Sequence, residues 1–275
     1  KQILSYRNSF GRILDVTMRL DTMLPDAIFK EALLSLEDIL ENQTISIYSI
    51  EKDSAFGRLR VCSKKIFEQT PKSLDLKDYR ILIETFQKNQ GWSNTSRAHS
   101  DRDYFYPIFN GDALALLVIV QRATHDQMAM YFENRLRIVC TLIESALLRA
   151  QQYHERFSDE FYLPGTRILK HEAFLDVLRV RAQMEEVAIS EYALLSVETT
   201  PETMRETAVL LQRFLRESDI IGDGEDGKIY VILSQAKEEH IPFVLERLKK
   251  GGFSFVQVSS ESQVLAQQEQ ETGRD

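Results

Sequence analysis

The sequence predicts two mixed modules, an α+β module followed by an α/β module, each with a central sheet flanked by helices. The chain has 275 residues, about two domains of ordinary size. Its apolar residues switch several times between the 3.6-residue spacing of helices and the strict alternation of strands. Hydrophobic residues make up 43% and charged residues 28%, the balance of an ordinary globular protein.

The first module opens with two helices and a hairpin. Residues 1–25 carry apolar side chains at helical spacing until Pro25 interrupts them, which predicts an N-terminal stalk helix. Residues 26–41 repeat the helical spacing. Residues 44–50 then alternate between polar and apolar side chains, as a half-buried strand does, and residues 58–62 are predicted to pair back on them.

A second hairpin and a long helix complete this module, which spans residues 26–157. A helix is predicted at residues 75–88 and a polar loop at 90–103. Two strands follow at 104–109 and 113–120, joined by Asn110-Gly111, and the long helix is predicted at 126–157. Asn-Gly between two apolar runs is a strong hairpin signal.

The second module, residues 158–258, alternates helices and strands. Its three helix–strand pairs are predicted at residues 170–186 and 190–197, 200–217 and 229–233, and 237–250 and 253–258. Thr200 is a suitable N-cap because Pro201 and an acidic residue follow it. This alternation predicts a sheet with helices layered on it. Residues 259–275, rich in Glu and Gln, are predicted to be a polar tail.

Charge and composition exclude several classes of function. The formal net charge is −8, which argues against non-specific binding of nucleic acid. The longest apolar run, residues 113–120, is too short to cross a bilayer. The five histidines are scattered, and Cys62 and Cys140 lie in apolar surroundings, which indicates buried reduced thiols. We therefore expect neither a metal site nor a cofactor.

An Arg-x-x-Asp pair is the candidate ligand-binding motif of the second module. The pattern occurs three times, at Arg12–Asp15, Arg156–Asp159 and Arg216–Asp219. The third pair stands out because it ends a predicted helix just ahead of an acidic hairpin. A guanidinium can make bidentate contacts with guanine or phosphate, and a carboxylate can accept hydrogen bonds from guanine N–H groups. The alternative is a cation in the last helical turn, favourable to the helix dipole, followed by a polar stop.

The element order of residues 26–150 resembles the GAF family of small sensor domains. The resemblance implies either a small-molecule pocket, here lined mainly by Ile, Leu, Phe and Tyr, or pairing through the first and last helices. Neither cysteine is placed to attach a chromophore. We favour dimerisation and relay over ligand sensing, and we expect weak homodimerisation through the helices at residues 1–23 and 126–157.

Residues 163–258 resemble a degenerate GGDEF domain. Glu225-Asp226-Gly227-Lys228-Ile229 occupies the signature position, and Phe174 and Leu175 match the opening helix of that family. The paired glycines of the signature are missing, and so is the base-recognising segment after the strand that ends at Glu198. The resemblance therefore implies a non-catalytic domain. Arg216 and Asp219 stand where the family has its inhibitory site, which binds cyclic di-GMP.

A GAF-like domain followed by a degenerate GGDEF-like domain resembles the PelD family of cyclic di-GMP receptors. The resemblance implies a regulator of Pel-type exopolysaccharide synthesis or export, and hence of biofilm formation. Its partners would be the inner-membrane components of that complex. It also implies that this chain is the cytoplasmic region of a membrane-anchored protein, whose transmembrane part is absent from this chain.

Cyclic di-GMP has two phosphates and two guanines, so further cations should converge on Arg216, the more so beside an acidic turn. The candidates are Arg247 and Lys250, late in the last helix, and Arg7 and Arg12 of the stalk helix. The alternative is that these residues are solvated surface charges.

Two other functions remain open at this stage. One is a divergent metal-dependent cyclase or nucleotide-processing enzyme that uses Glu198, Asp223 and Asp226 on a metal. The other is an interaction scaffold that binds no nucleotide and works through its helices.

Overall fold

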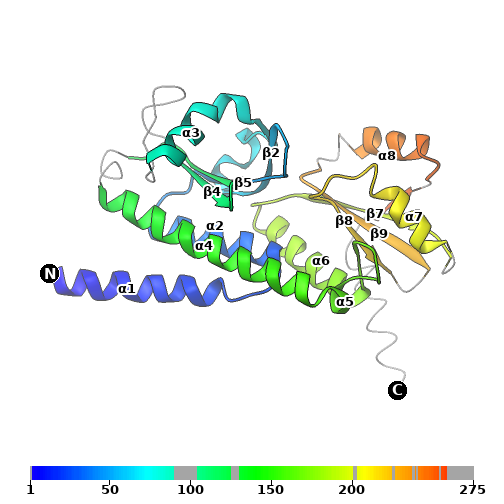
Figure 1. Ribbon diagram of the computed structural model, residues 1–275, viewed down its shortest axis with the longest axis horizontal. Coiled ribbons are helices and arrows are strands. Elements are labelled where there is room, and N and C mark those ends of the chain that lie inside the picture. Colours follow the sequence, from blue (N-terminus) through cyan, green and yellow to red (C-terminus); the bar gives the residue numbers. More distant parts are fainter. Residues whose placement is uncertain are drawn as a thin grey trace, which may run out of the picture. The chain divides into compact units, whose positions relative to one another are not determined.

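The computed structural model describes residues 2–89, 104–124, 130–200, 203–224, 227–236, 239, 241–253 and 255–258 (Figure 1). For residues 2–10, 82, 87–89, 130 and 198 it describes the backbone alone. The predicted loop at 90–103 and the tail at 259–275 lie outside this range. The chain divides into two compact units, Lys1–Tyr153 and His154–Asp275. Each contains a central sheet flanked by helices, as the sequence predicted.

The first unit is built on a five-stranded antiparallel sheet in the order β3-β2-β1-β5-β4. The strands are β1 (Ile45–Ile50), β2 (Phe56–Cys62), β3 (Ser73–Asp75), β4 (Tyr104–Asn110) and β5 (Ala113–Val120). Both predicted hairpins form, β1 with β2 and β4 with β5. The second turns at Gly111, whose φ of 61° suits a glycine.

Helices cover this sheet. They are α1 (Gln2–Arg19), α2 (Pro25–Leu40), α3 (Arg80–Asn89) and α4 (Met130–Arg156), with short 3-10 helices at Lys64–Gln69 and Leu76–Tyr79. Figure 1 shows α2 and α4 along one side of the sheet, with α1 beside them and α3 on the opposite side. Leu136, Cys140 and Ile143 of α4 are fully buried, at the helical spacing that predicted this element.

The predicted helix at 75–88 is divided. Asp75 accepts a hydrogen bond from the backbone of Lys77 at 3.0 Å and thereby caps the 3-10 helix, and α3 begins only at Arg80. None of the described helices is both long enough and apolar enough to cross a membrane.

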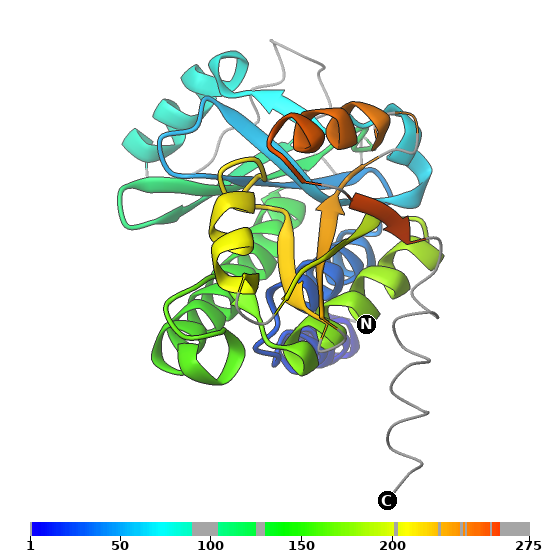
Figure 2. The ribbon, with the colours of Figure 1, turned by 90° about the vertical axis from the view of Figure 1, so that its right-hand side faces the viewer.

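The second unit has a five-stranded sheet in the order β10-β7-β9-β8-β6 (Figure 2). The strands are β6 (Ile168–Leu169), β7 (Tyr192–Glu198), β8 (Ile220–Asp223), β9 (Lys228–Ser234) and β10 (Phe255–Val258). Every pairing is antiparallel except that of β6 with β8.

Helices cover both faces of this second sheet. They are α5 (Ser158–Phe161), α6 (His171–Glu186), α7 (Met204–Leu211) and α8 (Ile241–Lys250). Figure 1 shows α6 on one side of the strands and α7 and α8 on the other. Ala208, Leu211 and Leu248 join alternate residues of the strands in one core on the α7 and α8 side.

The helix predicted at 200–217 is shorter than expected, because α7 ends at Leu211. The chain continues in tight turns, with the amides of Phe214 and Leu215 donating back to the Leu211 carbonyl at 2.9 and 3.2 Å. The Phe214 ring then packs against Phe253, with ring centroids 5.9 Å apart. Arg216 therefore lies in a turn, and the interpretation of this residue as a helix-dipole cation is wrong.

Candidate functional site

The turn at residues 216–219 is closed by its own aspartate. The Arg216 amide donates to Asp219 Oδ2 at 2.9 Å, and the Asp219 amide donates to the Arg216 carbonyl at 3.0 Å. Asp219 Oδ1 accepts a further bond from the amide of Ser234, at the end of β9, at 3.1 Å. One carboxylate thus ties the turn to itself and to the sheet.

The end of β9 is fixed by further bonds. The Ser234 hydroxyl donates to the Ser218 carbonyl. Gln235 has a positive φ of 53°, and its amide donates to the Glu191 carbonyl at 2.9 Å. Its side-chain amide donates to the Ser190 hydroxyl at 3.0 Å. The backbone beneath Arg216 is therefore anchored, whereas the Arg216 side chain is exposed to solvent.

Opposing effects act on the Asp219 carboxyl. Burial raises its pKa above the ordinary value, and this effect outweighs the others. The two backbone N–H groups lower the pKa, as do the guanidinium groups of Arg216 and Arg181. Each carboxylate oxygen has two lone pairs and accepts one backbone bond here, so capacity remains for a ligand donor.

The chain segment that carries Arg247 meets the segment that carries Arg216. The last turn of α8 contains Arg247, Lys249 and Lys250, all exposed. Lys250 pairs with Glu246 at 3.3 Å. Gly251 follows, and a Cβ there would lie 2.9 Å from the Phe214 ring. Only Leu215 separates Phe214 from Arg216, so this contact brings the basic end of α8 to the neighbourhood of the 216–219 turn.

The stalk-helix arginines belong to the other unit. Arg12 is exposed on α1, and its Nη1 lies 3.4 Å from Glu41 Oε1. The side chain of Arg7 lies outside the described residues. Their contribution to a cyclic di-GMP site stays a prediction.

The signature hairpin lies at the opposite end of β9. Lys228 begins β9, pairs with Glu198 of β7, and accepts a hydrogen bond from the Gly224 amide at 2.9 Å. Ser234, beside Asp219, ends the strand about 20 Å away. Asp223 is likewise about 13 Å along β8 from Asp219. The sequence analysis expected the acidic turn to lie beside Arg216, but Asp223, the described residue of that turn, lies at the far end of β8.

The carboxylates proposed for the enzyme alternative are only partly described. Asp223 ends β8, and its carbonyl lies 3.1 Å from His171 Nδ1. Glu225 and Asp226, and the side chain of Glu198, lie outside the described residues. Among the residues that are described, no group of three or more His, Cys, Asp or Glu could hold a metal ion.

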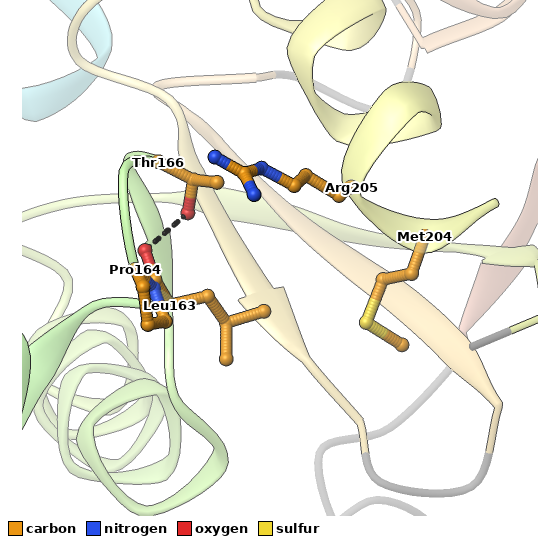
Figure 3. A pocket seen from close by; sticks show the side chains of 5 residues that line it. All are labelled: Leu163, Pro164, Thr166, Met204 and Arg205. Carbon is orange, nitrogen blue, oxygen red and sulfur yellow. Dashed lines mark hydrogen bonds between the residues drawn. The ribbon is translucent and has the colours of Figure 1, made fainter. Parts of the chain in front are cut away.

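A small cavity in the second unit was not predicted from the sequence. It has a volume of about 250 Å³ and is lined by Leu163, Pro164, Thr166, Met204 and Arg205 (Figure 3). Gly165 has a φ of 71°, and a Cβ there would lie 2.9 Å from Arg205 Nη2. Its lining residues come from a turn and from a helix about forty residues further along the chain. Local sequence patterns do not reveal that two such distant segments meet.

The interior of the first unit contains a cluster of apolar side chains. Leu59, Cys62, Ile66 and Phe105 are buried there together with Tyr48, whose hydroxyl donates to the Pro71 carbonyl at 2.9 Å. These buried side chains contribute to a core, and the small-molecule pocket that the resemblance implies stays a prediction. Cys140 is also buried, and burial raises its thiol pKa.

Comparisons with known proteins give similarities in structure. No protein-family profile matches the chain, and no curated protein matches it. PelD from Pseudomonas aeruginosa PA14 in complex with c-di-GMP is 15% identical, with 94% of each chain covered and a TM-score of 0.36. PelD from Pseudomonas aeruginosa PAO1 is 14% identical, with 98% of each chain covered and a TM-score of 0.32.

A GAF domain from an Acinetobacter phosphoenolpyruvate-protein phosphotransferase is also similar. It is 14% identical, covers 52% of this chain and 94% of its own, and has a TM-score of 0.41.

Proposed function

We propose that this chain is a non-catalytic receptor for cyclic di-GMP, with Arg216 as the principal ligand contact. The observation that carries the proposal is an exposed arginine on a turn whose backbone is locked by Asp219. Since the backbone is already ordered, binding needs to order only the arginine side chain, and the entropic penalty of binding is small. A guanidinium held in this way suits a bidentate contact with a guanine edge or a phosphate.

Asp219 and Arg247 complete the proposed site in different ways. Asp219 shapes the turn and keeps lone pairs for guanine N–H donors. Arg247 supplies a second cation, because the Phe214–Gly251 contact brings the basic end of α8 towards the turn. Arg7 and Arg12 are the further candidates for the remaining ligand charge.

The electrostatics around Arg216 favour an anionic ligand. Glu217, the nearest acid in the sequence, pairs with Arg167 at 3.3 Å. Asp223 lies about 13 Å along the strand, beyond the screening length of about 8 Å at physiological salt. Glu217 and Asp223 therefore oppose a phosphate at Arg216 only weakly, and Asp219 is the acid that stays close to it.

The biological output we propose is control of exopolysaccharide synthesis or export of the Pel type, through protein partners at the inner membrane. The support is the combination of a GAF-like unit with a degenerate GGDEF-like unit that keeps Arg216 and Asp219. In this role the ligand-bound state is the one that the partners recognise. The chain binds the nucleotide and does not process it, because the sequence lacks the paired glycines and the base-recognising segment of active cyclases.

Calorimetric titration with cyclic di-GMP tests the proposal. A bidentate arginine contact is worth about 1–3 kcal/mol, so Arg216→Ala should weaken binding about ten- to a hundredfold. Arg156→Ala is the matched control, since Arg156 is also an exposed arginine of the second unit, with its guanidinium 5.8 Å from the Phe157 ring centre. Equal affinities for the parent and Arg216→Ala would refute the site. Protein-dependent turnover of GTP or cyclic di-GMP with Mg²⁺ or Mn²⁺ would refute the receptor.

A further inference from the structure

Helix α6 runs antiparallel to β8 across one face of the second sheet. His171, at the start of the helix, contacts the carbonyl of Asp223, at the end of the strand, at 3.1 Å. One turn later Phe174 packs so closely on Gly222 that a Cβ there would lie 2.1 Å from the ring. Two points of contact therefore fix the register of the helix against the strand.

This register brings Arg181 to the level of Asp219. From Phe174 to Arg181 the helix advances seven residues, about 10 Å. From Gly222 back to Asp219 the chain covers three residues, also about 10 Å. Arg181 continues the buried stripe of Phe174 and Leu178, so its side chain is directed at the sheet.

Arg181 is an unusual residue to find at this position. It is 1% exposed and is the largest fully buried side chain among the described residues. A buried guanidinium requires a compensating group of opposite charge or good hydrogen bonds. The charges that act on Asp219 are Arg181 from α6 and Arg216 from the turn itself, and Glu217 of the turn is paired with Arg167.

We propose that Arg181 is a positioning residue, which holds the Asp219 carboxylate beneath the 216–219 turn and thereby fixes the backbone from which Arg216 meets its ligand. Arg181 does not touch the ligand, because its side chain is buried. The effect of Arg181 on the turn passes through Asp219. The Asp219 carboxylate accepts hydrogen bonds from the amides of both Arg216 and Ser234 only while its two oxygens remain acceptors. The ligand-affinity readout of this inference rests on the proposed function.

The test compares Arg181→Met, which removes the charge at similar volume, with Arg181→Lys, which keeps the charge. Arg179→Met is the matched control, since Arg179 is an exposed arginine on the same helix that pairs with Asp176 at 2.7 Å. Three quantities are measured: cyclic di-GMP affinity, the Asp219 pKa by carbon-13 NMR, and hydrogen exchange of the Arg216 and Ser234 amides.

Arg181→Met should weaken binding about tenfold, raise the Asp219 pKa and speed exchange of both amides. Arg181→Lys and Arg179→Met should resemble the parent. In an Asp219→Asn background, Arg181→Met should add no further loss of affinity, because the effect passes through Asp219. An unchanged Asp219 pKa and unchanged amide exchange in Arg181→Met would overturn the proposal.

Two outcomes separate this inference from its premises. If the parent does not bind cyclic di-GMP but Asp219 titration and amide exchange respond as expected, the ligand assignment fails and the positioning role stands. If Arg181→Met does not fold, the proposal is tested on the unaltered protein by NMR. The Arg181 Nε resonance should then shift as Asp219 titrates, and a resonance that does not respond overturns the proposal.

Discussion

Among the individual residues, the Asp219 carboxylate is subject to two opposing effects. Its oxygens accept backbone amides from the turn and from β9, while burial disfavours the charge that makes them good acceptors. The two arginines near it oppose the effect of burial. Arg216 is thus both a ligand contact in our proposal and one of the charges that keep its own turn in shape.

The raised pKa of Asp219 makes a prediction for stability. Because the folded-state pKa lies above the unfolded value, the folded state binds the proton more tightly than the unfolded state. The contribution of Asp219 to the free energy of unfolding is therefore complete below about pH 3.8 and falls as the pH rises through the folded-state pKa.

Denaturant unfolding of the parent and of Asp219→Asn, measured from pH 3 to 7, checks this sign. The difference in unfolding free energy between parent and variant should decrease with rising pH in the window just above the unfolded pKa, and level off beyond the folded-state pKa. A difference that increases with pH there would contradict the prediction.

The residues of the site could be predicted only in part. Arg216 and Asp219 are candidates from the sequence because their spacing and their place before a hairpin are local properties of it. The bond from Ser234 to Asp219 and the burial of Arg181 were not, since both depend on elements that meet only after the sheet has formed. Sequence periodicity identifies Arg181 as one more charged residue of an amphipathic helix.

Among the helices and strands, the packing of α6 on β8 depends on one glycine, Gly222. A Cβ at Gly222 would lie 2.1 to 2.6 Å from three atoms of Phe174, including its Cβ, so the helix and not only a flexible ring would have to move. Gly222→Ala should therefore lower the free energy of unfolding by about 1–3 kcal/mol, as overpacked cores do.

Gly11→Ala is the control for this change. Gly11 lies inside α1 with nothing within 4 Å of the added Cβ, so the substitution should raise helix stability by up to about 1 kcal/mol. Both variants are measured by denaturant unfolding. Equal stability of the parent and Gly222→Ala would show that α6 does not pack on β8 in this way.

Elements were easier to predict than their ends. The alternating run at 44–50 and the Asn-Gly turn give β1 and the β4–β5 hairpin almost residue for residue. The end of α7 was missed by six residues, because the apolar spacing continues through Phe214 and Leu215 while these side chains already pack in the turn that follows the helix. A periodic pattern records which residues are buried but does not distinguish helix from tight turn.

For the molecule as a whole, exposed apolar side chains on two helices of the first unit bear on self-association. The first unit exposes large apolar side chains on the outer faces of its helices: Leu14 and Met18 on α1, which are 54% and 69% exposed, and Ile138 and Leu148 on α4. Leu14 and Met18 lie one helical turn apart, and exposed apolar side chains placed in this way are typical of helices that meet a partner.

We therefore expect weak homodimerisation through α1 and α4, visible by sedimentation at high protein concentration. The double variant Leu14→Glu, Met18→Glu should shift the equilibrium to the monomer, since two charges would enter an apolar contact. Ile81→Glu, at a 77% exposed position on α3, is the control and should leave association unchanged. A parent that stays strictly monomeric at high concentration would contradict the expectation.

The length of β9 has a consequence for how this sequence can change. The strand keeps the 216–219 turn and the hairpin before Lys228 about 20 Å apart, well beyond the screening length of about 8 Å at physiological salt. Glycines and carboxylates at the hairpin end can therefore be substituted without changing the electrostatic potential at Arg216. The seven residues of β9 thus separate the two ends of the strand electrostatically, so that substitutions at one end should leave ligand affinity at the other unaltered.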